Sequence, residues 1–279
     1  MEKNKRKEDS PSLLSSQRGM SLPVTFLMLF VSLIVLISAT YYFSIIRINM
    51  KTQAFKVSGA EQEMLSFEKI VSFVAWSPES SQFYEFGNFG GEFQVVSTAR
   101  RLVLNLTDGS SFQLVFFNSS IGKIAYQLPA SETQDSFFLV GDNRAIINQS
   151  WSTTTQLSVS QNTENHYEIA LSYRPSVGSA VTGSSDGKPV NNLRVYIVNF
   201  NSSQSVTRLG SFRLKASCLS VTSNWQSYNF SNPITSLLLK ASLDGAADEV
   251  SLPVSSSSEG AVVNLETIVC HVKMETVGW

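Results

Sequence analysis

The sequence predicts an α+β chain that is mainly β: one long N-terminal helix, partly transmembrane and partly amphipathic, precedes an extracytoplasmic antiparallel β-sandwich-like head. Three observations predict this order. No charged residue occurs between Arg18 and Arg47, a length that suits a membrane helix. Apolar residues then recur at alternating steps of four and three as far as Val74, as on one face of a helix. After Pro78 the apolar period becomes two, which is the period of strands.

The composition is that of a globular chain without a strong electrostatic field. Of its 279 residues, 43% are hydrophobic and 15% are charged, a balance that is typical of folded proteins. The 21 basic and 22 acidic residues nearly cancel, so we expect no nucleic-acid partner. The first segment, 1–19, is predicted to be a basic cytoplasmic leader, because it contains Lys3, Lys5, Arg6, Lys7 and Arg18.

The apolar segment 20–46 is predicted to cross a membrane once. About 20 apolar residues span a bilayer as a helix, and residues 22–46 exceed that length. The basic flank places the N-terminal side in the cytoplasm by the positive-inside rule, so residues 47–279 are expected outside. The alternative is a secretory signal cut after Ala39, but the apolar run continues to Ile46, beyond the about 7–15 residues usual for signals.

Residues 47–77 are predicted to continue the helix beyond the membrane with an apolar seam. An amphipathic stripe of this kind packs against a core, so we expect its part from Met64 to Val74 to pack on the chain's own head. The part of the helix nearer to and within the membrane is available to other copies of the chain. Gly59 is the weak point of the helix, where it is expected to bend or pause. The seam comprises Ile46, Met50, Val57, Ala60, Met64, Phe67, Val71 and Val74, with Gln53 as its one lapse.

The apolar run follows the junction Gln17-Arg18-Gly19-Met20-Ser21-Leu22-Pro23-Val24. This junction and the helix after it resemble the N-terminus of archaeal type IV pilins and pilin-like proteins, over residues 17–76. The resemblance implies that a prepilin peptidase reads Arg18 and cuts between Gly19 and Met20 on the cytoplasmic side. It also implies that the freed helix meets other pilin-like subunits in a filament core. The large head favours a minor or pilin-like component over the repeating subunit.

The head is predicted to contain two parts, a β-rich subdomain at 78–150 that packs on the helix and a β-sandwich domain at 151–279. Apolar residues alternate at strand spacing in both, between turns rich in Gly, Asn, Ser and Pro. The first hairpin turns at Thr107-Asp-Gly-Ser-Ser111. Its apolar pattern predicts Leu104 opposite Leu114, with a three-residue loop or a bulge.

Two covalent modifications are predicted for the head. Cys218 and Cys270 share the inward parity of their strands, so a disulfide between them is expected in an oxidising exterior, with two buried thiols as the alternative. Asn-x-Ser/Thr triplets are acceptors for N-glycans, although they also arise by chance in a chain rich in Ser and Asn. They occur at Asn105, Asn118, Asn148, Asn201 and Asn229.

No catalytic residue, metal site or cofactor is predicted, and the chain is not expected to be an enzyme. Ser66 and Lys69 match the Ser-x-x-Lys of penicillin-interacting enzymes, but no Lys-Thr-Gly partner occurs in the sequence. His166 and His271 are expected at outward strand positions, and two histidines with two cysteines make no zinc pattern.

We therefore expect a structural cell-surface protein with one membrane pass, its N-terminus in the cytoplasm and its head outside. The resemblance implies a pilin-like subunit or accessory of an archaeal type IV filament. Two other classes stay open. One is an anchored surface glycoprotein that binds partners through its β-domain, and the more remote one is a membrane-tethered hydrolase with an unrecognised site.

Overall fold

The computed structural model describes residues 21–129, 136–148, 154–161, 166–200 and 206–278. Within these residues, one long helix, α1 (Ser21–Ala75), is followed by a domain that is mostly β. The strands are β1 (Ser81–Phe86), β2 (Glu92–Thr107), β3 (Gln113–Leu128), β4 (Phe137–Val140), β5 (Ile147–Asn148), β6 (Thr155–Gln161), β7 (Tyr167–Tyr173), β8 (Ser176–Ser185), β9 (Lys188–Phe200), β10 (Val206–Leu209), β11 (Phe212–Phe230), β12 (Ser236–Leu243), β13 (Ala246–Pro253) and β14 (Ala261–Val277).

The chain divides into two compact units, Met1–Ala54 and Phe55–Trp279. The second unit contains the last part of α1 and every strand described. The sequence predicted a further boundary at residue 150. Strands from both sides of residue 150 share each of the two sheets.

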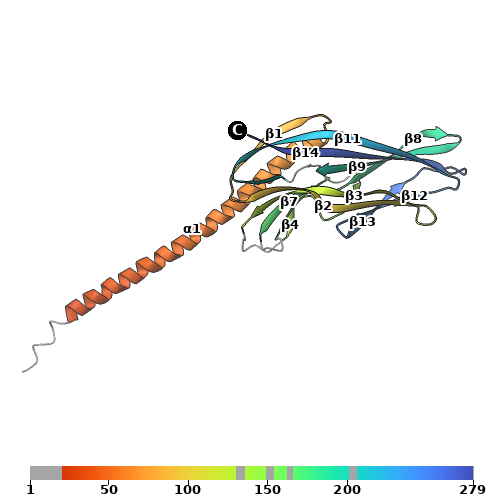
Figure 1. Cartoon of the computed structure of the whole chain (residues 1–279). Helices are drawn as coiled ribbons and strands as arrows, with labels where there is room; N and C mark the ends of the chain where they lie inside the picture. Colours follow the sequence, from red (N-terminus) through yellow and green to blue (C-terminus); the bar gives the residue numbers. More distant parts are fainter. Residues whose placement is uncertain (1–20, 130–135, 149–153, 162–165, 201–205, 279) are drawn as a thin grey trace, which may run out of the picture. The chain divides into compact units, whose positions relative to one another are not determined.

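Sheet A has the strand order β1-β11-β14-β9-β8-β5. Sheet B has the order β13-β12-β2-β3-β7-β6-β4, with β10 paired to β2. In Figure 1, β11 and β14 are long curved ribbons that run side by side, and they pair antiparallel along almost their whole length. With 19 and 17 residues, these strands exceed the length of about 10 residues that strands usually reach. Strands this long accumulate twist, and the sheets curl.

The pairing is not purely antiparallel, which corrects the expectation from the sequence. β14 and β9 are parallel, with Val262 beside Val190 at one end and Val272 beside Phe200 at the other. β5 and β8 are also parallel. Parallel neighbours need a long crossover, and the chain between β9 and β14 supplies one, because it forms β10, β11, β12 and β13 on the way.

The apolar seam of α1 is buried in the first of two cores, which we call the helix core. Ala60, Met64, Phe67, Val71 and Val74 have no exposed surface, which confirms the predicted seam from residue 60 onward. The rings of Phe86 and Phe93 lie 6.0 and 5.8 Å from that of Phe67, both edge-on. The strands of both sheets contribute to this core, among others through Tyr126, Ile169, Phe200, Phe212, Leu214, Val272 and Met274.

A second core, the strand core, lies between the sheets where β2, β12, β9 and β14 contribute apolar residues. β14 gives Val263, Leu265 and Val269 to the strand core, and Cys270, Val272 and Met274 to the helix core. β9 gives Leu193, Val195 and Ile197 to the strand core, and Val198 and Phe200 to the helix core. Successive strand residues point to opposite faces, so both strands turn opposite faces toward the two cores.

The β2–β3 hairpin differs in register from the predicted one. Leu114 pairs with Leu106, and Leu104 pairs with Phe117, so the expected pair of Leu104 and Leu114 is wrong. A bulge is present, between Leu104 and Asn105. Leu102, Leu104 and Leu106 are fully buried. The extra residue of the bulge lies on β3, so the alternation of β2 continues unbroken and keeps these three on one face.

Asp108 explains why the loop of this hairpin is longer than expected. Its Oδ1 accepts hydrogen bonds from the backbone N–H groups of Ser110, Ser111 and Phe112, at 2.8, 3.0 and 3.0 Å. These bonds, led by that of Ser110, lower the pKa of Asp108 to about 2. Because the folded-state pKa is depressed, this contribution to stability is present above the ordinary carboxyl pKa and is lost as the pH falls toward about 2.

Gly59 lies inside α1, where the ring of Phe89 approaches the helix closely. A Cβ atom at Gly59 would lie 2.4 Å from Cε1 of Phe89, and one at Gly87 would lie 3.0 Å from Cε2. Phe89 thus fits between two glycines and packs against the helix core. We infer that Gly59 allows this ring to approach the helix closely and is not a point where the helix bends.

We expect Gly59→Ala to have opposite effects in two backgrounds. With Phe89 present, the added methyl displaces the ring, and overpacking of this kind costs about 1–3 kcal/mol. With Phe89→Ala, the same change stabilises the helix by about 1 kcal/mol, because glycine is a poor helix former. Urea unfolding of the four proteins in a double-mutant cycle measures the coupling. An equal effect of Gly59→Ala in both backgrounds would contradict this packing.

Candidate membrane helix and cysteine pair

The N-terminal part of α1 exposes apolar side chains all around the helix. Its most apolar 18-residue window has a mean hydropathy of 2.6, and none of that window is buried. By length and composition α1 can cross a membrane, although a signal sequence near the N-terminus meets the same criterion. Its exposed residues include Leu22, Phe26, Met28, Phe30, Leu33, Val35, Ile37, Tyr41, Phe43 and Ile45.

Three hydroxyl groups on this exposed stretch are satisfied within the helix itself. Ser32 donates to the carbonyl of Leu29, and Thr40 donates to that of Leu36, each over 2.8 Å. Thr52 donates to the carbonyl of Ile48 at the same distance. Unpaired polar groups are costly in hydrocarbon. The bonds of Ser32 and Thr40, which lie within the apolar segment 20–46, therefore let these two hydroxyls enter an apolar environment without needing water.

The predicted cleavage residues Arg18, Gly19 and Met20 lie outside the described residues.

At its other end, α1 is held in the head by polar contacts as well as by its seam. Glu61 accepts a hydrogen bond of 2.5 Å from the hydroxyl of Tyr167, and Glu68 accepts one of 2.6 Å from Thr155. Glu63 accepts one of 3.1 Å from the backbone N–H of Gly87. None of these three glutamates belongs to the apolar seam, and the sequence did not indicate that they bind the strands.

Two tyrosines at this contact are held protonated. Burial, followed by the hydrogen bond to Glu61, raises the pKa of Tyr167. Burial and the nearby Glu63 raise the pKa of Tyr84 to about 12, and its hydroxyl donates to the Glu63 carbonyl at 3.3 Å. Both hydroxyls therefore remain donors at any physiological pH.

The two cysteines lie side by side on the paired strands β11 and β14. Both are buried, as their strand parity predicted, and their Sγ atoms are 3.4 Å apart. A bulge at Leu219 separates Cys218, which pairs with Val272, from Val221, which pairs with Cys270. Burial, and then contact with Cys218, raises the pKa of Cys270 to about 12. The thiolate is the reactive form, so the thiol of Cys270 is unreactive once the head has folded.

The predicted glycosylation residues differ in exposure. Asn118 and Asn229 are exposed, and their Oδ1 atoms accept hydrogen bonds from Arg101 and Lys188, respectively. Asn105 and Asn148 are half-buried, and Oδ1 of Asn105 is buried with no hydrogen-bond partner in the described chain. Asn201 lies outside the described residues. Exposure thus favours Asn118 and Asn229 as acceptors.

The other residues considered from the sequence are not brought together. Ser66 Oγ donates to the carbonyl of Gln62 in the preceding helical turn, over 2.9 Å, and Lys69 is exposed on the same helix. His166 and His271 are half-buried, and burial lowers the pKa of His271. Among the described residues, no three His, Cys, Asp or Glu side chains form a group that could hold a metal ion.

Comparison with protein-family models, curated proteins and solved structures finds no match to this chain.

We expect Cys218 and Cys270 to be joined by a disulfide in the protein isolated from an oxidising compartment, formed before the two residues become buried. Mass spectrometry of peptides from the non-reduced protein should contain the cross-linked pair. The control is the Cys218→Ala variant, in which Cys270 should react with an alkylating agent once the chain is denatured. Alkylation of both thiols in the unreduced, denatured parent would contradict the bond.

Proposed function

We propose that the chain is a structural cell-surface protein, a pilin-like subunit or accessory of an archaeal type IV filament. Its leader, 1–19, is removed between Gly19 and Met20. The head, a sandwich-like β-domain, lies outside the membrane. The single observation that carries the proposal is the exposed apolar part of α1, whose most apolar window has no buried surface.

An exposed surface of this kind needs an apolar partner. Soluble domains rarely expose contiguous apolar patches larger than a few hundred Å², whereas this helix exposes large apolar residues from Leu22 to Ile48. A bilayer and a bundle of identical helices both satisfy that need. A helix suits both settings, because its backbone hydrogen bonds are made internally. It can therefore move from the bilayer into a bundle of helices without unfolding.

The short junction before this helix supports the pilin-like reading over a permanent anchor. A permanent anchor does not need its cytoplasmic leader removed, whereas entry into a filament does. Gly19 follows Arg18 directly before the apolar run, and a glycine next to the membrane edge is readily accessible to a membrane protease.

A second candidate, a permanently anchored surface glycoprotein, is favoured by one observation. Asn118 and Asn229 are exposed sequon residues on the strands of the head. This candidate shares the topology and differs in the leader, which it retains.

The topology is tested by protease shaving of intact cells that carry a tag at each end of the chain. Because the basic flank is held in the cytoplasm, we expect the C-terminal tag to be lost from intact cells. A tag inserted before Lys3 should be protected until the cells are lysed. Survival of the C-terminal tag until lysis would show that the orientation is wrong.

Processing is tested by N-terminal sequencing after co-expression with an archaeal prepilin peptidase. We expect Met20 as the first residue, and we expect Arg18→Ala or Gly19→Val to block the cut. Arg6→Ala is the matched control, a basic leader residue away from the junction, and it should leave the cut intact. A retained Met1 would reject pilin processing in favour of the anchor. Thr40 as the first residue would reject both and indicate a secreted β-protein.

A further inference from the structure

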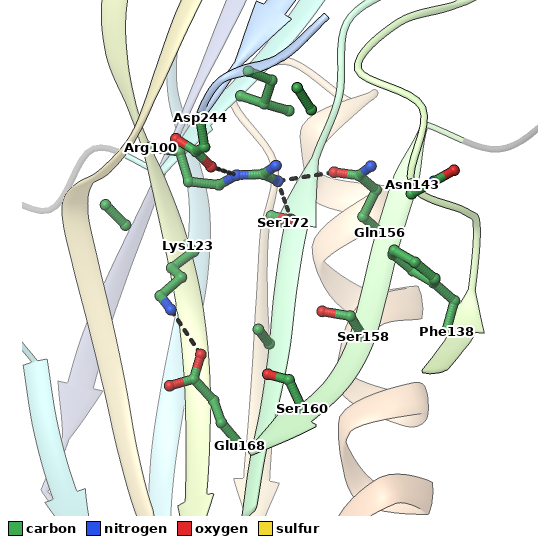
Figure 2. Close-up of a pocket in the computed structure, with 14 residues that line it drawn as sticks. Arg100, Lys123, Phe138, Asn143, Gln156, Ser158, Ser160, Glu168, Ser172 and Asp244 are labelled. Atoms are coloured by element: carbon green, nitrogen blue, oxygen red, sulfur yellow. Dashed lines mark hydrogen bonds and ion pairs between the residues drawn. The ribbon is translucent and has the colours of Figure 1, made fainter. Parts of the chain in front are cut away.

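A polar cavity of about 400 Å³ lies on the face of sheet B that is turned away from the helix core. Figure 2 shows it as a recess lined by side chains from β2, β3, β4, β6 and β7. We call it the polar recess and define it by Arg100, Lys123, Phe138, Gln156, Glu168 and Ser172. Its volume falls within the range of about 300–1,000 Å³ that small-molecule sites occupy.

The floor of the polar recess is both polar and buried. Along β7, Tyr167, Ile169, Leu171 and Tyr173 enter the helix core, so the residues between them face the recess. Of these, Glu168 is 8% exposed and Ser172 is 6% exposed, and Gln156 on the neighbouring β6 is 4% exposed. Buried polar side chains on an outer sheet face are unusual, because such faces are normally solvated.

A network of hydrogen bonds fixes these groups in place (Figure 2). Arg100 donates from Nε to Asp244 over 2.6 Å, and from Nη1 to Gln156 over 2.8 Å and Ser172 over 2.7 Å. Lys123 forms an ion pair of 2.7 Å with Glu168. The side chains therefore hold their positions before any ligand arrives, which reduces the entropy lost on binding.

The rim beside β6 is also fixed. The segment 141–147 carries Asn143, which lines the cavity. Arg174, which is 1% exposed, donates from beneath to the carbonyl of Arg144 at 3.3 Å and to the carboxylate of Asp142. Gln156 Nε2 donates to the Asp142 carbonyl at 2.9 Å and to the Arg144 carbonyl at 3.0 Å. A buried arginine and Gln156 thus hold this rim through several hydrogen bonds.

The charges of the polar recess determine what chemistry fits it. Each cation at its surface is paired with a carboxylate, Arg100 with Asp244 and Lys123 with Glu168, so the recess has no net charge to attract an ion. It offers donors and acceptors in plenty, including the hydroxyls of Ser158, Ser160 and Ser172. A ligand that both donates and accepts hydrogen bonds, and carries no charge, matches this lining.

Phe138 adds an apolar wall to this polar lining. It lies on β4 at the mouth of the cavity, and 41% of its surface is exposed. Figure 2 shows its ring on the same side of the recess as Asn143 and Gln156. A sugar ring has hydroxyls at its edge and C–H groups on its faces. Its edge can therefore form hydrogen bonds with the hydroxyls and amides of the recess, while one of its faces packs on an aromatic ring.

We propose that the polar recess binds an uncharged, hydroxyl-rich ligand the size of one or two sugar rings. The site is separate from α1, and it does not depend on whether the chain assembles into a filament. On a surface protein it provides a contact to neutral glycans.

The full-length protein is tested in lauryldimethylamine oxide micelles, because many other detergents carry sugar headgroups. The neutral probes are the methyl glycosides of glucose, mannose and galactose, together with N-acetylglucosamine and maltose. Glycine and sodium sulfate serve as the zwitterionic and anionic probes. Binding is measured by isothermal titration calorimetry and by saturation-transfer difference NMR. We expect at least one neutral probe to bind with a Kd of about 1 mM or lower, and glycine and sulfate not to bind.

A matched pair of variants then assigns the binding to the polar recess. Phe138→Ala should raise the Kd of the neutral probe that binds most tightly by about tenfold or more. Phe137→Ala is the control, because Phe137 lies on the same strand with the same 41% exposure but does not line the cavity. It should change the Kd by less than about twofold. No binding of any neutral probe, binding of glycine or sulfate in their place, or equal effects of the two variants would each overturn the proposal.

Discussion

The burial of one face of α1 between the two sheets is the interaction on which the rest of the head depends. Burying a side chain such as Met64, Phe67 or Val71 completely contributes about 1.5–3 kcal/mol each, and all three have no exposed surface. A domain as a whole is stable by only about 5–15 kcal/mol. The buried seam of α1 therefore contributes a free energy that is comparable with the stability of the whole domain. The helix serves as the central element of the helix core.

The packing of β7 on the helix core also determines on which face of sheet B the polar recess forms. A helix and a second sheet cover different faces of the same strands, so β9 and β14 turn opposite faces to the two cores. β7 of sheet B packs one face on the helix core, and Arg100, Lys123 and Asn143 line the space over its other face. Glu168 and Ser172 are buried there without belonging to either core. The recess is thus enclosed by side chains of neighbouring elements, on the face of β7 that does not pack on the helix core.

The sequence predicted the periodic features of the chain and missed those that depend on contacts between distant segments. Helical spacing predicted the seam through Phe67, and strand parity predicted that Cys218 and Cys270 face inward. The parallel pairing of β9 with β14 could not be predicted, because periodicity is the same for both directions of pairing. The polar recess was missed for a related reason. Alternation on β7 places Glu168 and Ser172 on the outer face, where polar residues are expected. Lys123 and Arg100, which cover them there, come from strands distant in the sequence. The small Ala170 between Glu168 and Ser172 is the one local sign.

The central claim is that residues 55–75 belong to the fold of the head, whereas residues 1–54 do not. Thermal and urea unfolding of two shortened chains, 55–279 and 76–279, tests it most directly. Because the first keeps the whole buried seam from Ala60 to Val74, it should be soluble without detergent and unfold in a single cooperative transition. The second should aggregate or show no cooperative transition, since its sheets would surround an empty core. A cooperative transition of 76–279 with the same midpoint as 55–279 would contradict the account.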